Sequence, residues 1–136
     1  MAELTQYIRQ EADRLASACT GCGRCVEACP MTPYVRLPEL TVAGEVAEGV
    51  KAVLRGEAGP SYALSWLNAC TWSGACIPAC PEHIDPLVMV RLARIIAVGG
   101  MGGTRQIETG DDKQYFTRLR MFAKLQLSED EFREWM

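Results

Sequence analysis

The chain has 136 residues, 49% hydrophobic and 23% charged, which fits one modest globular domain. Its net charge of −3 gives no reason to expect nucleic acid or an anionic membrane surface as a partner. The longest apolar run, residues 87–98, is too short to cross a bilayer, and residues 1–17 lack the apolar core of a signal peptide. We therefore expect a cytoplasmic protein with no membrane span.

The first predicted element is an amphipathic helix over residues 3–17, in which apolar residues recur at helical spacing. It leads into "CTGCGRCVEACP", which contains Cys19, Cys22 and Cys25, followed by Cys29 before a proline. Three cysteines at this spacing can bind three corners of a cubane iron–sulfur cluster from one loop, and the glycines between them let backbone amides approach its sulfides. This group is therefore predicted to bind a cluster.

Two more helices are predicted before a second cysteine group. The first spans residues 44–57 and ends near Gly56, and the second spans residues 60–69. The second group is "CTWSGACIPACP", residues 70–81, and each of its positions lies 51 residues after its equivalent in the first group. The chain therefore uses one motif twice, with Ser73 in place of one cysteine.

The second group precedes a predicted helix over residues 85–98, which opens with an Asp-Pro cap. The sequence "GGMGG", residues 99–103, predicts a flexible break. The tail then carries "DDKQYFTRLRMFAKL" and "SEDEFREWM", the latter with Ser128 and Glu131 at capping-box spacing. Since no alternating strand pattern occurs, the predicted fold is all-α with a helical tail.

The predicted domain division places the cysteine groups in residues 1–98 and assigns residues 99–136 to a glycine-rich break and a helical tail. The apolar and aromatic residues of the tail suit a segment that binds a partner. They equally suit a helix that packs on its own domain.

Other uses of the seven cysteines fit less well. Seven leaves one unpaired in a disulfide scaffold, and zinc usually takes two pairs of ligands well separated in sequence. A redox-active pair such as Cys22 and Cys25 is possible in isolation, but the repeat disfavours it. His83, the one histidine, is expected to lie at the surface or behind the ligands. Three aromatic residues are expected to pack around the clusters: Tyr34, Trp66 and Trp72.

Two such motifs in a small helical chain resemble the dicluster ferredoxin domain, which also forms the C-terminal half of the iron–sulfur subunit of succinate dehydrogenase and fumarate reductase. The chain is most similar to the small C subunit of heterodisulfide reductase and of heterodisulfide reductase-like complexes. The similarity lies in its length, in the short helical insert between the motifs, and in the segment "EHIDPLVMVRLARI" after the second motif. It covers about residues 1–98, and the tail carries no recognised motif.

The resemblance implies crossed ligation, in which each cluster takes one cysteine from the other motif. The first cluster, a [4Fe–4S] cluster, would be held by Cys19, Cys22, Cys25 and Cys80. The second would be held by Cys29, Cys70 and Cys76. A full family member has a cysteine at the position of Ser73, whereas the succinate dehydrogenase relatives lack it and hold a [3Fe–4S] cluster.

Three interpretations of Ser73 remain open. The first is a [3Fe–4S] cluster that the serine merely lines, and we rank it highest. The next is a [4Fe–4S] cluster lacking one cysteine ligand, with an open or water-bound iron. The last is a [4Fe–4S] cluster bound weakly by the serine oxygen, which ranks lowest because a serine proton is far harder to remove than a cysteine proton.

The implied function is electron transfer from one subunit of a complex to another. By resemblance, the partners are an A-like flavin subunit and a B-like catalytic subunit of a heterodisulfide reductase-like complex, with sulfur oxidation as one such setting. The chain itself shows no catalytic constellation, because "GGMGG" follows a predicted helix and does not fit a nucleotide-binding loop. The alternatives are the iron–sulfur subunit of a quinone-linked membrane oxidoreductase, and a free ferredoxin or redox sensor.

Overall fold

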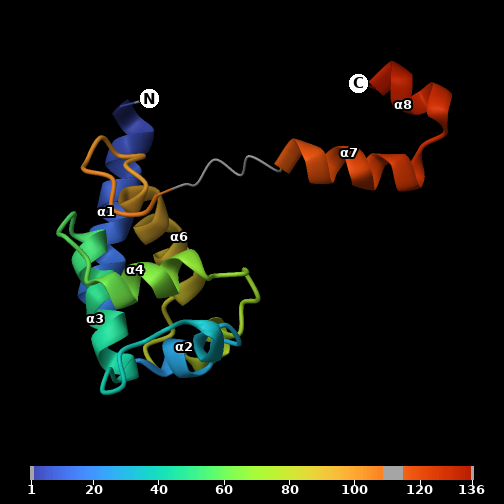
Figure 1. Ribbon diagram of the computed structural model, residues 1–136. Helices are drawn as coiled ribbons and strands as arrows, with labels where there is room; N and C mark the ends of the chain where they lie inside the picture. The colour runs from blue at the N-terminus through green and yellow to red at the C-terminus, as the bar shows by residue number, and fades with distance from the viewer. Residues whose placement is uncertain (1, 109–114, 136) are drawn as a thin grey trace.

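The computed structural model describes residues 2–108 and 115–135 (Figure 1). Within these ranges every regular element is helical and no strand occurs, so the predicted all-α fold is confirmed. The elements are α1 Ala2–Ala18, α2 Arg24–Glu27, the 3-10 helix η1 Thr32–Tyr34, α3 Ala43–Leu54, α4 Ser61–Asn68, α5 Cys76–Ala79, α6 Pro86–Ala97, α7 Tyr115–Gln126 and α8 Glu129–Trp135. The one-turn helices α2 and α5, inside the cysteine groups, are too short for hydrophobic periodicity to predict.

Two helix ends follow their local signals. Helix α6 starts where the Asp-Pro pair predicts, and Asp85 Oδ1 accepts the backbone N–H groups of Leu87 at 2.9 Å and Val88 at 3.1 Å. Helix α3 ends at Leu54, shortly before Gly56, which has a φ of 79°. The helices that flank the cysteine groups therefore have well-defined ends.

The core lies between α1, α3, α4 and α6, and α3 packs against the other three and against α2. Its largest fully buried side chains include Leu15, Val50, Leu67 and Met89, one from each of these helices. Leu4 belongs to the predicted apolar face of α1 but is 60% exposed. The reason is that the first turns of α1 extend beyond the packed helices (Figure 1). Only the second half of α1 therefore supports the core.

Trp66 links the core to the first cysteine group. Its indole N–H donates to Thr32 Oγ1 at 2.9 Å, and the Thr32 hydroxyl donates to the carbonyl of Val26 at 2.6 Å. Trp66 therefore packs in the core, and its packing around a cluster stays a prediction. Tyr34 does not pack, because its side chain is 80% exposed at the end of η1, so the prediction that it packs around the clusters is wrong.

Residues 99–107 turn back onto the helical body. The backbone N–H groups of Gln106 and Ile107 donate to the carbonyl of Ala97 at 2.7 and 3.0 Å, and the Gln106 side chain accepts the N–H of Gly59 at 2.7 Å. Ile107 is buried in the core. Packing therefore continues past the glycine-rich segment, while the division into two domains remains a prediction.

The tail forms two helices that pack on each other, α7 and α8. The predicted capping box is confirmed: the Ser128 N–H donates to Glu131 Oε2 at 2.9 Å, and the Glu131 N–H donates to Ser128 Oγ at 3.4 Å. The part of the first predicted tail helix that precedes Tyr115 lies outside the described residues. Helix α7 leaves Met121 and Leu125 largely exposed.

The membrane prediction can be compared with the helices that the structure describes. Within residues 2–108 and 115–135, no helix combines the length and the apolar character needed to cross a membrane.

Candidate functional site

Four thiols from both motifs lie around one small cavity. They are Cys19, Cys22, Cys25 and Cys80. The first three come from the loop after α1 and from α2, and the fourth comes from the end of α5. Ala47 of α3 and Met89 of α6 contribute apolar parts of the wall, and the acidic residue Glu82 also lines the cavity. Helices α2 and α5 pack against each other, which is how a cysteine of the second motif reaches the first.

The remaining three cysteines form a second set around Cys76, which is the most buried of the seven. The pKa of the Cys76 thiol is raised, first by burial and then by negative charge at Cys70, Cys29 and Asp85. Cys29 of the first motif is thus grouped with Cys76 through this electrostatic effect and not through a shared cavity. The first set has the members that crossed ligation requires, while the membership of the second set, and ligation itself, remain proposals.

The two sets are adjacent to each other. Burial raises the pKa of Cys25 to about 12, and negative charge at Cys19, Cys76 and Cys22 adds to the rise. Cys25 lies on α2 and Cys76 on α5, and these two helices pack against each other, so the two sets are neighbours. A raised pKa disfavours the thiolate, and a metal bound to the sulfur would stabilise the thiolate again.

The repeat extends to the backbone. Gly21 and Gly23 have φ angles of 73° and 78°, and the equivalent residues of the second motif, Trp72 and Gly74, have 67° and 75°. A tryptophan in this left-handed region costs about 1–3 kcal/mol. The Arg91 guanidinium lies 4.0 Å from the centre of the Trp72 ring and offsets part of that cost. The chain therefore keeps the same loop conformation in both motifs even where it strains a residue.

In each motif a backbone N–H donates to a side chain of the loop, at positions that are not equivalent in the repeat. The N–H of Gly21 donates to Cys19 Sγ at 3.4 Å, and a bond of this kind favours the thiolate and helps to set the reduction potential of a bound cluster. In the second motif, the N–H of Ala75 donates to Ser73 Oγ at 3.4 Å. Ser73 is exposed, as is its equivalent Cys22. The serine oxygen therefore accepts a bond within its own loop, and Ser73 stands at the position that Cys22 holds in the first motif.

Gly23 is the position at which this loop most depends on glycine. A Cβ atom there would overlap the backbone of Ala43 and Gly44 at the start of α3, and the positive φ adds strain. We expect Gly23→Ala to destabilise the protein by about 3 kcal/mol or more and to lower its iron content. Thermal unfolding and iron analysis measure both effects.

Gly102 provides the matched control for that variant. It has a φ of 80°, but nothing lies within 4 Å of the position of a Cβ atom. We expect Gly102→Ala to cost only the conformational penalty, about 1–2 kcal/mol, with unchanged iron content. Equal losses of stability and iron in the two variants would contradict the role of close packing at Gly23.

His83 and the zinc alternative gain no support from the geometry. His83 is exposed, with a φ of 52°, and does not line the thiol cavity. Among the residues that the structure describes, no three Cys, His, Asp or Glu side chains converge closely enough for a single metal ion. A cubane cluster does not require such convergence, because each thiolate binds a different iron.

Two residues beside the first thiol set were missed at the level of sequence. Lys51 Nζ lies 2.7 Å from Glu48 Oε1 on α3, and the Glu48 carboxyl packs against Gly21 in the loop between Cys19 and Cys22. Lys51 is buried, although lysine is rarely so. The available signal was its place one helical turn after the apolar Ala47, on the buried side of α3.

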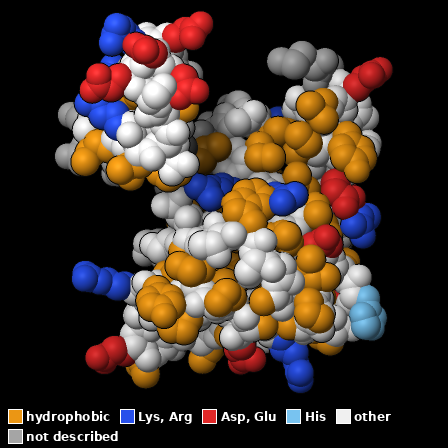
Figure 2. All heavy atoms as spheres, turned by 90° about the vertical axis from the view of Figure 1, so that its right-hand side faces the viewer, with side chains coloured by type: hydrophobic (Ala, Val, Ile, Leu, Met, Phe, Trp, Pro, Cys, Tyr) orange, Lys and Arg blue, Asp and Glu red, His pale blue; other side chains and the backbone are white. Residues whose placement is uncertain are grey.

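The second thiol set lies close to an exposed face. A groove of about 620 Å³ is lined by Trp72, which precedes Ser73, and by Arg91, Arg94, Ile95 and Val98 around α6. In Figure 1 the loop after α4 projects to the right, and Figure 2 shows the molecule from that side. Hydrophobic side chains gather on this face with basic side chains among them (Figure 2). Such a face suits contact with another protein.

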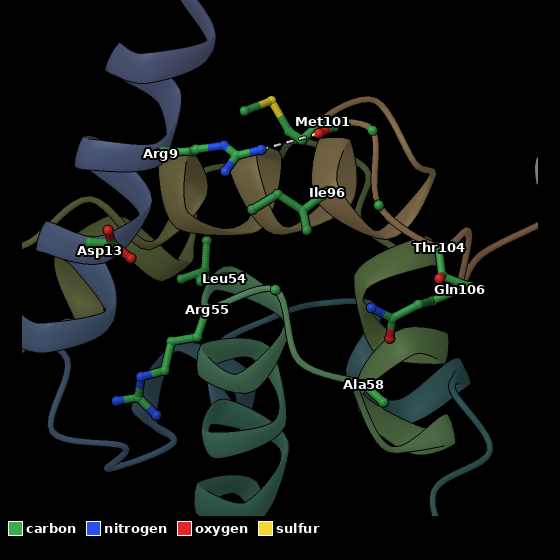
Figure 3. Close-up of a pocket in the computed structure, with 12 residues that line it drawn as sticks. Arg9, Asp13, Leu54, Arg55, Ala58, Ile96, Met101, Thr104 and Gln106 are labelled. Carbon is green, nitrogen blue, oxygen red and sulfur yellow. Dashed lines mark hydrogen bonds between the residues drawn. The ribbon is translucent and has the colours of Figure 1, made fainter.

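A separate cavity of about 610 Å³ lies between α1, the end of α3 and the glycine-rich segment (Figure 3). Arg9 crosses it and donates to the carbonyl of Met101 at 3.5 Å, and Asp13 points into it. No cysteine lines this cavity, so it is distinct from both thiol sets.

Comparison with known proteins places the cysteine motifs in a family. A family model of the 4Fe-4S dicluster domain matches residues 15–84, a range that contains all seven cysteines and extends from the end of α1 to the loop before α6. Searches of curated proteins and of solved structures found no match.

Proposed function

Because the chain belongs to the 4Fe-4S dicluster domain family, we propose that it is an electron-transfer subunit with two iron–sulfur clusters. The observation that carries this proposal is the grouping of seven thiols into two adjacent sets. The first set, Cys19, Cys22, Cys25 and Cys80, would hold a [4Fe–4S] cluster. The second set, Cys29, Cys70 and Cys76, would hold a [3Fe–4S] cluster, with Ser73 beside it. When bound, such clusters take up and give back one electron at a time.

The residues around the thiols suit this task. Cys76 is buried and Cys25 is half-buried, and low exposure to water suits a site that holds an iron–sulfur cluster. The Gly21 N–H supplies a fixed dipole beside Cys19.

The proposed partners are those implied by the resemblance to the small C subunit of heterodisulfide reductase. Electrons would pass between an A-like flavin subunit and a B-like catalytic subunit, in the cytoplasm, in a heterodisulfide reductase-like complex such as those of sulfur oxidation. Two surfaces support the proposal that the chain binds other subunits. One is the groove at Trp72 and Arg91, and the other is formed by the exposed apolar residues of α7, Met121, Phe122 and Leu125. The tail would hold a partner while the groove faces its redox centre.

A second function is favoured by one observation, the set of only three thiols around Cys76. By resemblance, a three-cysteine site of this spacing occurs in the iron–sulfur subunits of quinone-linked membrane oxidoreductases. In that case the partner would be a membrane subunit, and the [3Fe–4S] cluster would pass electrons to quinone.

Purification from the native host tests these proposals. A tagged chain is isolated without oxygen, and co-eluting proteins are identified by mass spectrometry. We expect a flavin subunit and a cysteine-rich subunit in equal amounts with the chain. A variant with Met121, Phe122 and Leu125 replaced by serine should keep its iron and lose these partners.

The other outcomes are equally informative. Co-elution with a membrane subunit would support the quinone-linked alternative. A chain that carries both clusters but elutes alone would contradict the complex and leave a free ferredoxin or redox sensor. A chain without iron from anaerobic cells would overturn electron transfer altogether.

A further inference from the structure

Lys51 is a buried cation close to the first thiol set. Lys51 is 8% exposed, and it is the one buried charged residue among those whose side chains the structure describes. Burying an ammonium group costs several kcal/mol unless opposite charge compensates it. Glu48 compensates in part through the 2.7 Å ion pair, but its own side chain is 54% exposed, so water screens it. The electrostatic effect of the Lys51 charge is therefore strongest on the buried side of the lysine side chain.

The cysteine loop lies on that buried side. The carboxyl group of Glu48 packs against Gly21, and Gly21 lies between Cys19 and Cys22. Burial raises the pKa of the Cys19 thiol, while the Gly21 N–H and the positive charge of Lys51 oppose the rise. The ammonium group contacts a carboxyl group that packs on Gly21, so it lies beside the loop between Cys19 and Cys22.

We propose that Lys51 raises, and Glu48 lowers, the reduction potential of the cluster held by Cys19, Cys22, Cys25 and Cys80. This inference rests on the proposed function, because it requires a cluster in that set. One-electron reduction adds one negative charge and forms or breaks no bond. A fixed buried cation stabilises the reduced state more than the oxidised one, and a neighbouring anion does the opposite. Lys51 and Glu48 are positioning residues, because their charges act through the electrostatic potential at the cysteine sulfurs that hold the first cluster.

The second set has the opposite charge beside it. Asp85 is the acidic residue that adds to the raised pKa of Cys76, and its carboxylate is held by the first N–H groups of α6. Lys51 should affect the first cluster more than the second, because it lies beside the loop that carries Cys19 and Cys22.

The test is a redox titration with dithionite on anaerobically purified protein, followed by electron paramagnetic resonance of the reduced four-iron signal. At the midpoint potential of the wild type, Lys51→Met should lower the ratio of reduced to oxidised first cluster about tenfold. This corresponds to a midpoint potential that is lower by ~59 mV for one electron. Glu48→Gln, which keeps the side-chain shape, should raise the ratio several-fold. Lys51→Arg should stay near the wild type. Lys124→Met, the same charge change on exposed α7, should have no effect.

Iron analysis separates the possible failures. Wild-type protein without the four-iron signal contradicts the proposed function itself. Variants with wild-type iron and an unchanged midpoint overturn the role of the charge pair. If Lys51→Met loses its cluster, the inference is tested by Glu48→Gln alone. A midpoint potential of Glu48→Gln that does not rise above the wild-type value overturns the inference. A purely structural role would not produce shifts of opposite sign in the two variants.

Discussion

Replacing Cys80 with alanine is expected to convert the first cluster from four irons to three, although Cys80 belongs to the second motif. The structure places Cys80 on the cavity that Cys19, Cys22 and Cys25 also line. A [4Fe–4S] cluster left with three thiolates loses the iron that has no thiolate, as proposed for the three-cysteine second set. We expect the loss of about one iron per chain. The reduced four-iron signal should disappear while the oxidised three-iron signal persists.

Cys29→Ala is the matched variant, and its expected result is the reverse. Cys29 lies in the first motif but neighbours Cys76 and Cys70. Its loss should abolish the oxidised three-iron signal and leave the reduced four-iron signal intact. Iron and sulfide analysis with electron paramagnetic resonance of both redox states measures the two variants together. If each variant loses the cluster of its own motif instead, ligation is not crossed.

Ser73→Cys is expected to convert the second cluster from three irons to four. The second motif has the same loop conformation as the first, with left-handed Trp72 and Gly74, so a thiol at this position should lie as Cys22 does. A thiolate forms and binds iron far more readily than a serine oxygen. We expect the oxidised three-iron signal to vanish and the iron content to rise by about one atom per chain.

Ser73→Ala is the control for that conversion. The serine oxygen accepts the N–H of Ala75, so its removal should loosen the loop slightly without changing the cluster type. The three-iron signal should therefore persist in this variant. Loss of the second cluster in Ser73→Ala would show that the oxygen binds iron. Wild-type protein without an oxidised three-iron signal, prepared anaerobically, would favour an open four-iron site.

Local signals predicted the helices well where they depend on neighbouring residues. The Asp85 cap of α6, the Ser128–Glu131 capping box and the all-α fold follow from such signals. The grouping of Cys80 with the first motif does not follow from spacing, because it depends on how α2 and α5 pack. Only the resemblance to a known domain suggested it.

Features that run against residue preferences could not be predicted. Tryptophan disfavours positive φ, so nothing in its type indicates that Trp72 copies the conformation of Gly21. Lysine is usually exposed, so the buried position of Lys51 became visible only once α3 packed on the first loop. The return of residues 99–107 onto the body depends on long-range bonds of Gln106, whereas a glycine-rich sequence predicts flexibility.

Native mass spectrometry of the anaerobically purified chain tests the presence of two clusters most directly. It weighs the intact protein with its inorganic content, so iron and sulfide are counted in the same molecule. We predict a chain with about seven irons and eight sulfides, one four-iron and one three-iron cluster. A chain that carries a single cluster, or zinc in place of iron, would contradict the assignment of seven thiols to two clusters.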